Sequence, residues 1–422
     1  PRRIAKMLSC VTSATVVLFI VFYCLKTVIS DCRHSYLTVC DTFEDFKNYK
    51  DVDSISELMI GSEKGTNMTS VDLMKTLFLD RYHKLTTLKI IRALNKLENT
   101  QYAYLCFYSN SPLQYFILYG NILQTIDSNH FPVVPLKRMS LVNNQIEFVK
   151  PWAFRSHEIE NLDLSDNLLE AIESESLPLK NASKVITIRN NKLSHIDPGS
   201  FSPSLEALNL DNNKLRYIQD EVLEDLVNLK ELTLSHNNFN VFPKIDHLTQ
   251  LVIFDISHNK ITTFKKGIFE KMDKLRFVDL SNNQITSDLV LEWISIPNKQ
   301  PTLTVSLALN RLRNVNLDNV GQASLQNQTF VLYGNPWDCN RWPKVKTALS
   351  GHESKCDVEF LSSGSVPYCI NYLSGSYPFD GLWDQEIDTF HKTVKESEKK
   401  AGCILAPNRH EWLHHINVGC VA

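Results

Sequence analysis

Apolar residues and asparagines recur along this chain at spacings of 22 to 27 residues. Each copy has the form Leu-x-Leu-x-x-Asn, with another residue replacing a leucine in some copies. An apolar residue precedes each asparagine by five places, and another follows it by two. The ten asparagines are Asn121, Asn144, Asn167, Asn191, Asn213, Asn237, Asn259, Asn283, Asn310 and Asn335. So many ordered copies indicate a repeated structural unit.

Each copy predicts one short β-strand, because alternating apolar residues place one face of a strand in a core. Strands of successive copies would stack in parallel and bury their leucines in one continuous core. The asparagine would turn the chain out of the strand, and its amide would satisfy backbone groups of neighbouring repeats. A weaker copy, Leu85-Thr-Thr-Leu88-Lys-Ile90, predicts one more strand, so about 10–11 repeats are expected over residues 84–337.

The pattern Leu-x-x-Leu-x-Leu-x-x-Asn-x-Leu stands nearly intact in most copies and resembles the leucine-rich repeat family. The resemblance implies an α/β-type solenoid, a leucine-rich repeat horseshoe with a parallel β-sheet on its concave side. It also implies disulfide-stabilised N- and C-terminal caps, a helical C-terminal cap, and a phenylalanine spine on the convex side. The phenylalanines at the matching positions are Phe131, Phe154, Phe201 and Phe269.

Outward-facing strand residues are the candidate binding surface, because solenoids bind partners on the concave face or its flanking loops. The candidates are Tyr119, Asp163, Arg189, Asp211, Glu231, Asp255 and Asp279. Their acidic lean suits a cationic protein surface. The aspartates also match the common repeat sequence Leu-Asp-Leu-Ser, so a purely structural role is the other interpretation.

The N-terminal segment is predicted to direct export. Arg2, Arg3 and Lys6 precede a run from Met7 to Leu25 that carries no charge. Such a run is typical of a cleaved signal peptide, and its length also suits a signal-anchor that stays in the membrane. Residues 1–30 are assigned to one of these alternatives, and both place the remaining chain outside the cell.

Three Asn-x-Ser/Thr tripeptides fit an exported glycoprotein, because N-linked glycans are added to such sequences in secreted proteins. The candidate glycosylation sites are Asn67, Asn181 and Asn327. Asn327 falls at a repeat position that is normally buried.

Cysteines flank the repeats, near an expected N-terminal cap at residues 31–83 and an expected C-terminal cap at residues 338–422. The front group is Cys32, Cys40 and Cys106, and the back group is Cys339, Cys356, Cys369, Cys403 and Cys420. Ten stacked strands would separate the groups by roughly 45 Å, whereas a disulfide joins Cα atoms within about 7 Å. Each group therefore pairs within itself and leaves one cysteine over.

Within these groups we expect a Cys32–Cys40 bond and a bond from Cys339 to Cys356 or Cys369. Cys106 is then expected to be a buried thiol, and a remaining cysteine of the back group could link to another chain. Cys403 and Cys420 complete the disulfide candidates.

The segment Asn335-Pro-Trp-Asp-Cys339 resembles the opening of a leucine-rich repeat C-terminal cap, although Arg341 replaces the usual second cysteine. The arrangement that follows is similar to the cap of the mosquito leucine-rich immune proteins, in a short or membrane-anchored form. Ile370 follows Cys369, where many members have another cysteine. Secreted solenoids of that family form disulfide-linked heterodimers and hold a complement-like thioester protein in solution. The resemblance therefore implies a second leucine-rich repeat chain and a complement-like protein as partners.

The segment from Asp384 to Lys400 predicts an amphipathic helix, because Trp383, Ile387, Phe390 and Val394 share one face at helical spacing. Such a helix would pack on the last repeat as part of the cap, or it would bind a partner.

Composition and motifs exclude several functions. Lys and Arg number 44 against 47 Asp and Glu, so a generally basic nucleic-acid binder is excluded. His410-Glu-Trp-Leu-His414 matches a zinc-protease motif, but it lies between two cysteines and close to the end of the sequence, without a surrounding protease domain. We expect no cofactor and no catalysis. The expected function is an extracellular protein-binding scaffold of innate immunity; the alternative is a membrane-tethered adhesion or receptor ectodomain.

Overall fold

The computed structural model describes residues 17–20, 37–40, 56–61, 83–92, 111–128, 130–131, 134–155, 157–177, 183–294, 302–316, 325, 327–349, 369–370, 387 and 391–392. The chain divides into two compact units. The first unit contains residues 1–239 and 243–251, and the second contains residues 240–242 and 252–422.

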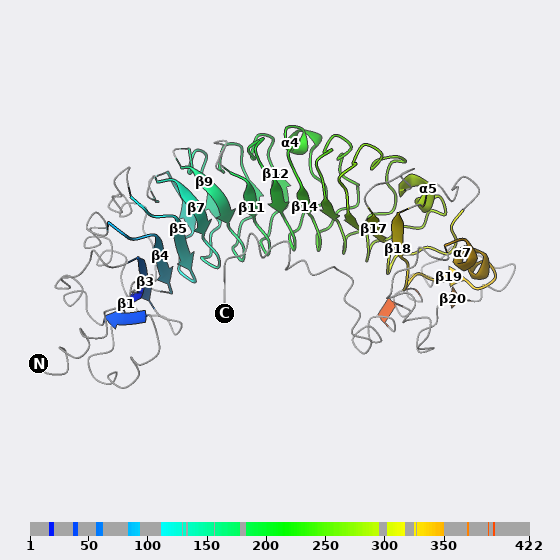
Figure 1. The fold of residues 1–422 in the computed structure, drawn as a ribbon, viewed down its shortest axis with the longest axis horizontal. Helices are drawn as coiled ribbons and strands as arrows, with labels where there is room; N and C mark the ends of the chain where they lie inside the picture. The colour runs from blue at the N-terminus through cyan, green and yellow to red at the C-terminus, as the bar shows by residue number, and fades with distance from the viewer. Residues whose placement is uncertain are drawn as a thin grey trace, which may run out of the picture. The chain divides into compact units, whose positions relative to one another are not determined.

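The first unit is built on a parallel β-sheet, which runs from blue to green in Figure 1. In spatial order its strands are β2 (Leu37–Cys40), β1 (Val17–Ile20), β3 (Glu57–Gly61), β4 (Thr87–Ile91), β5 (Tyr115–Tyr119), β7 (Leu136–Ser140), β9 (Ile159–Asp163), β11 (Val185–Thr187), β13 (Ala207–Asn209) and β14 (Glu231–Thr233). Equivalent leucine positions pair directly, as Leu162 does with Ile186. The predicted parallel stacking of repeats is therefore confirmed.

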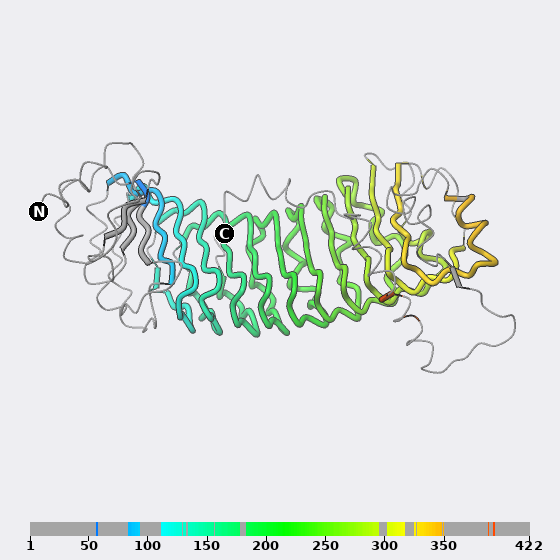
Figure 2. The backbone as a smooth tube through the Cα atoms, turned by 90° about the horizontal axis from the view of Figure 1, so that it is seen from below, coloured from blue at the N-terminus to red at the C-terminus, as the bar shows by residue number. Residues whose placement is uncertain are grey.

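Short elements and turns connect these strands on the other side of the first unit. The short elements are β6 (Thr125–Ile126), β8 (Phe148–Val149), β10 (Ala171–Ile172), β12 (His195–Ile196) and helix α4 (Asp220–Leu223). Strand β6 pairs with β8, and β10 pairs with β12, again in parallel. Figure 2 shows each repeat as one turn of the backbone tube, with successive turns side by side.

The second unit continues the same repeat. Its sheet contains β15 (Ile253–Asp255), β16 (Phe277–Asp279), β17 (Leu303–Ser306) and β18 (Gln328–Val331). Strand β19 (Trp337–Asp338) pairs with β20 (Cys369–Ile370), and the helices are α5 (Val290–Ile294) and α7 (Trp342–Ala348). The described parts of the expected C-terminal cap therefore include a helix and a short parallel ladder.

Alternating strand residues form the core of each repeat. In β9 the Leu162 side chain is buried while Asn161 and Asp163 are half-buried on the other face. Removing apolar area from water supplies about 25 cal/mol per Å², so this alternation is what holds the strands together. The predicted phenylalanine positions are all buried, and the rings of Phe131 and Phe154 stack with centroids 6.1 Å apart.

The recurring asparagines form a ladder through the interior, as predicted. Asn167 Nδ2 donates to the Leu141 carbonyl of the preceding repeat at 2.9 Å. Its side-chain oxygen accepts from the backbone N–H groups of Asn144 and Ile146 at 2.9 and 3.1 Å. Asn191, Asn213 and Asn237 make the corresponding contacts. The ladder satisfies backbone groups that the inward turn would otherwise bury without partners.

The residue before each ladder asparagine has a left-handed backbone. These residues are Gly120, Asn143, Asp166, Asn190, Asn212, His236, His258, Asn282, Leu309 and Gly334, with φ between 53° and 69°. Glycine, Asn, Asp and His tolerate this region better than most residues, which explains their recurrence at this place. Leu309 is the exception in this column.

The repeat architecture extends further toward the N-terminus than the sequence pattern predicted. Strand β3 lies in the expected N-terminal cap, yet Leu58 pairs with Leu88 of β4 in the same parallel register. The pattern missed β3 because no ladder asparagine follows it. Strand β1 falls within the predicted export segment and pairs with β3; whether that segment is cleaved or retained stays a prediction.

Candidate functional site

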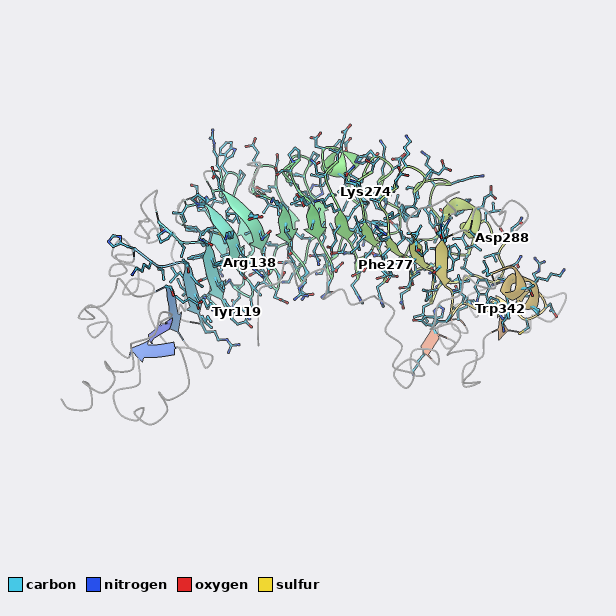
Figure 3. The ribbon with its side chains drawn as sticks, in the orientation of Figure 1. Tyr119, Arg138, Lys274, Phe277, Asp288 and Trp342 are labelled. Atoms are coloured by element: carbon cyan, nitrogen blue, oxygen red, sulfur yellow. The ribbon has the colours of Figure 1, made fainter. Side chains whose placement is uncertain are left out.

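The concave-face positions of the first unit form the candidate binding surface. They are the strand residues that alternate with buried leucines, so their side chains leave the core. Figure 3 shows Tyr119 on β5 and Arg138 on β7. Tyr119 is half-buried, and the Arg92 guanidinium lies over its ring at 5.7 Å from the centroid. This contact holds a cation against an aromatic face at the edge of the surface.

An ion pair between neighbouring strands lies at the centre of this surface. Arg138 Nη2 is 3.2 Å from Asp163 Oδ2, and both side chains are largely buried. The other oxygen of Asp163 accepts from the Ser165 N–H at 3.1 Å and from its hydroxyl at 2.6 Å. Asp163 therefore combines both predicted roles: it supports the local turn and it faces the concave surface.

The remaining predicted residues of the first unit also lie on this face. Arg189 is exposed, whereas Asp211 and Glu231 are half-buried. Asp211 Oδ1 accepts the Ser235 N–H at 2.7 Å, which ties it to the next repeat. Arg189 is thus the most accessible charged group of the predicted set.

Asp255 and Asp279 differ from the other candidates because both are buried in the second unit. Their exposed fractions are 0% and 7%, and they stand directly opposite each other on β15 and β16. Each accepts an N–H two residues further on, from Ser257 or Ser281, at 2.9 Å. Burial raises the pKa of the Asp279 carboxyl. In this arrangement neither carboxyl is accessible to a partner, which favours the structural interpretation for both.

The C-terminal segment reaches the repeats of the second unit. Ile387, His391 and Lys392 are helical, Ile387 is buried, and His391 Nε2 donates to the Asn310 carbonyl at 3.0 Å. These residues fall within the predicted amphipathic helix and agree with its packing on the last repeats. The zinc-protease motif at His410 lies outside the described residues.

Sequence reasoning missed Arg138 and Arg92. Arg138 stands two places before Ser140 on the same strand face, so period-two alternation could have found it. Its pairing with Asp163 depends on the register between repeats, which one repeat alone does not reveal. Within the described residues, no three or more His, Cys, Asp and Glu side chains gather as a metal site.

The predicted cap and glycosylation residues are described only in part. Cys339 takes part in a disulfide bond, and its partner stays a prediction. Cys40 ends β2 and Cys369 begins β20, while Cys32, Cys356, Cys403 and Cys420 lie outside the described residues. Asn67 and Asn181 also lie outside them. Asn327 is exposed and has a φ of 58°, so the expectation of a buried position was wrong. A turn ahead of β18 carries it out of the core.

Comparison with known proteins identifies the repeat. A leucine rich repeat family model matches residues 184–239 and 245–285, and a BspA type leucine rich repeat region of six copies matches residues 66–176. No curated protein matches the sequence. The chain is a leucine-rich repeat protein. Within the described residues, we find no helix with the length and apolar character needed to cross a membrane.

Solved structures share this fold at low sequence identity. A chain of the Toll–Spätzle complex of Drosophila is 17% identical, with a TM-score of 0.55 over 78% of this chain and 42% of that one. The leucine-rich repeat domain of mosquito APL1B is 17% identical, with a TM-score of 0.48 over 72% and 84%. An internalin of Listeria monocytogenes is 16% identical, with a TM-score of 0.46 over 70% and 77%. This chain thus spans less than half of the matched Toll–Spätzle chain.

Proposed function

We propose that this protein is a non-catalytic, extracellular scaffold that binds a partner protein through the concave face of its first unit. The observation that carries the proposal is the Arg138–Asp163 pair, flanked by Tyr119 under Arg92 and by the exposed Arg189. Tyrosine and arginine are enriched at the centres of protein interfaces. Here they stand on adjacent strands fixed by the asparagine ladder, so little ordering is required on binding.

We further propose a role in innate immunity. The fold is shared with a chain of the Toll–Spätzle complex, which is described as a hub of development and innate immunity in Drosophila. The segment Asn335–Cys339 resembles the cap of mosquito leucine-rich immune proteins. The partners proposed on this basis are a complement-like thioester protein and a second leucine-rich repeat chain.

A charge exchange tests the concave surface. The double variant Arg138→Asp with Asp163→Arg keeps an opposite-charge pair across β7 and β9 but reverses its direction, so folding should be retained. Its affinity for a co-secreted complement-like thioester protein is measured by surface plasmon resonance and is expected to fall at least tenfold. The control is Asp166→Asn, which changes an exposed residue just beyond the strand. Unchanged affinity in a folded charge-exchanged protein would contradict the proposal.

The compartment is tested on protein secreted from animal cells. N-terminal sequencing is expected to find a start near Asp31, and a gel run without reductant is expected to show a dimer that reductant dissolves. Retention of residues 7–25 in a monomer would instead favour the membrane-tethered adhesion or receptor ectodomain.

A further inference from the structure

We propose that the first unit carries a second docking surface, outside the concave face, for a basic and apolar segment of a partner protein. Its centre is the row of residues four places after successive ladder asparagines, which we call the flank row. The flank row consists of Thr125, Phe148, Ala171, His195 and Tyr217. Trp152, which follows Phe148 by four residues, completes the surface.

Backbone pairing places the flank-row residues side by side. Thr125 pairs with Phe148, and Ala171 pairs with His195. Two hydrogen bonds bracket Phe148 and Ala171: Leu168 N–H to Ile146 O at 2.8 Å, and Trp152 N–H to Glu175 O at 2.7 Å. At about 4.8 Å per strand, Phe148 and His195 start about 10 Å apart, with only a methyl group between them.

The large apolar side chains of this surface face solvent. Phe148 is 61% exposed, Trp152 54% and Tyr217 54%, whereas the next residue after Phe148 and after Tyr217 is buried. Isolated exposed apolar residues are ordinary, but aromatic rings gathered on one face mark interaction sites. Tryptophan and tyrosine are also the residues that contribute most at protein interfaces.

The backbone at Trp152 indicates that its exposure has a use beyond folding. Its φ is 61°, in the left-handed region that a bulky residue enters only at a cost. The equivalent position eight places after a ladder asparagine is Gly199 in a later repeat, with a φ of 74°. An exposed indole recovers little of this cost by packing. The sequence therefore keeps a tryptophan where glycine fits the backbone better.

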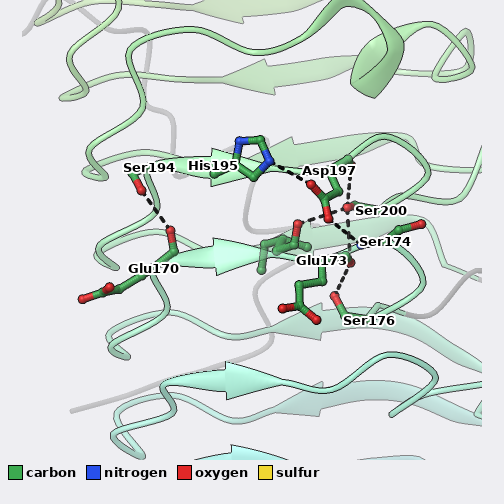
Figure 4. A network of polar contacts seen from close by, with 9 residues as sticks. Glu170, Glu173, Ser174, Ser176, Ser194, His195, Asp197 and Ser200 are labelled. Carbon is green, nitrogen blue, oxygen red and sulfur yellow. Dashed lines mark hydrogen bonds and ion pairs between the residues drawn. The ribbon is translucent and has the colours of Figure 1, made fainter.

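Charge selects the kind of partner. Lys150 pairs with Asp127 at 2.7 Å, and His195 pairs with Asp197 at 2.8 Å. Three more carboxylates border the flank row, and no ion pair engages them among the described residues. They are Glu147, Glu170 and Glu173. Figure 4 shows Glu170 and Glu173 extending away from the polar network that joins His195, Asp197 and Ser200. The surface thus presents unpaired negative charge beside apolar rings.

Lysine and arginine side chains of a partner match this combination. Their aliphatic stems would lie against Phe148, Ala171 and Trp152, while their cations would reach Glu147, Glu170 and Glu173. Trp152 already accepts a cation, because the Arg155 guanidinium lies over its ring at 6.0 Å from the centroid. The flank row lies beyond the ladder asparagines and shares no residue with the concave set, so its occupation is independent of the proposed function.

Peptide binding to the full chain tests the proposal. The probes are two fluorescent 15-residue peptides, one of alternating Lys and Leu and one of alternating Glu and Leu, together with an array of neutral glycans. Anisotropy is expected to show binding of the lysine peptide alone. Trp152→Gly and Phe148→Ser are each expected to weaken it at least fivefold. The double variant Glu170→Gln with Glu173→Gln is expected to weaken it and to reduce its salt dependence.

Two controls separate docking from folding and from the concave surface. Trp152→Gly suits the local backbone, so its melting temperature is expected to stay within about 3 °C of wild type. Val227→Ala removes another exposed apolar side chain and is expected to leave binding unchanged. The Arg138–Asp163 charge exchange is also expected to leave it unchanged. Equal binding of both peptides, glycan binding lost in Trp152→Gly, or lysine-peptide binding untouched by the flank variants would each overturn the proposal.

Discussion

The backbone N–H of Asn144 donates a hydrogen bond of 2.9 Å to the side-chain oxygen of Asn167, one repeat further along the chain. Asn167 also bonds Leu141 and Leu164, and all of these groups are buried. Asn167→Ala is therefore expected to leave several buried backbone groups without partners. At about 1–3 kcal/mol each, the loss in the free energy of unfolding should be about 3–5 kcal/mol. Urea unfolding measures it.

Asp166→Asn is the matched control for this change. Asp166 is exposed, has a φ of 57° that asparagine tolerates, and accepts from Asn190 Nδ2 through an oxygen that asparagine retains. Its effect should stay within about 0.5 kcal/mol. An equally small effect of Asn167→Ala would mean that water or relaxation replaces the ladder.

Acidification is expected to destabilise the first unit through His130. Burial lowers the pKa of His130 from 6.5 to about 4, although the Asp127 carboxylate opposes the shift. The unfolded chain takes up this proton below about pH 6.5 and the folded chain only near pH 4. The free energy of unfolding should therefore fall as pH drops through this window, by about 2–3 kcal/mol. Urea unfolding at pH 7.0 and 4.5 compares the two.

The matched variant for this prediction is His130→Asn. His130 Nδ1 accepts the Asp127 N–H at 2.8 Å, and an asparagine oxygen can take over that role. The variant has no titrating ring, so its stability should depend less on pH between 6.5 and 4.5. Identical pH dependence in both proteins would assign the effect to other groups.

Two phenylalanines six positions apart should respond very differently to alanine. Phe154 is fully buried and stacks on Phe131, so Phe154→Ala is expected to cost about 3–5 kcal/mol. Phe148 is exposed, and Phe148→Ala should change stability by less than about 0.5 kcal/mol. Thermal unfolding of both variants checks the contrast. A large loss in Phe148→Ala would show that its ring supports the fold rather than a partner.

The left-handed turn eight places after a ladder asparagine gives a further paired prediction. Gly199 has a φ of 74°, and an added Cβ would lie 3.4 Å from Ser174 Oγ, so space is adequate and the backbone sets the penalty. Gly199→Ala should therefore cost about 1–2 kcal/mol. Glu175 has a φ of 61° at the equivalent place, and Glu175→Gly should not lower stability. Differential scanning calorimetry distinguishes the two; a loss in Glu175→Gly alone would reverse the assignment of strain.

The repeats could be predicted from sequence because their determinants are local. Leucine alternation and the asparagine spacing place each strand within a window of about ten residues, and the structure follows them from β4 to β18. Strand β3 was missed because it has the alternation without the asparagine. The left-handed column before each asparagine was visible in the sequence as recurring Gly, Asn, Asp and His, and the aligned repeats could have shown it.

The site was less predictable because it depends on contacts between repeats. Asp163 was identified, but its partner Arg138 comes from the neighbouring strand. Asp255 and Asp279 occupy the same repeat position as Asp163, and yet they are buried. Burial is decided by what covers a face, and the repeat sequence alone does not encode that.

The asparagine ladder also constrains how this protein can change in length. Each rung requires the same offset between one repeat and the next, as with Asn144 and Asn167, which are 23 residues apart. Adding or deleting one complete repeat leaves every rung with an equivalent partner. Adding three residues inside a strand would break the rungs on both sides and turn apolar side chains outward. Growth and shortening are therefore expected in whole-repeat steps, while the turns between strands absorb the small differences in repeat length.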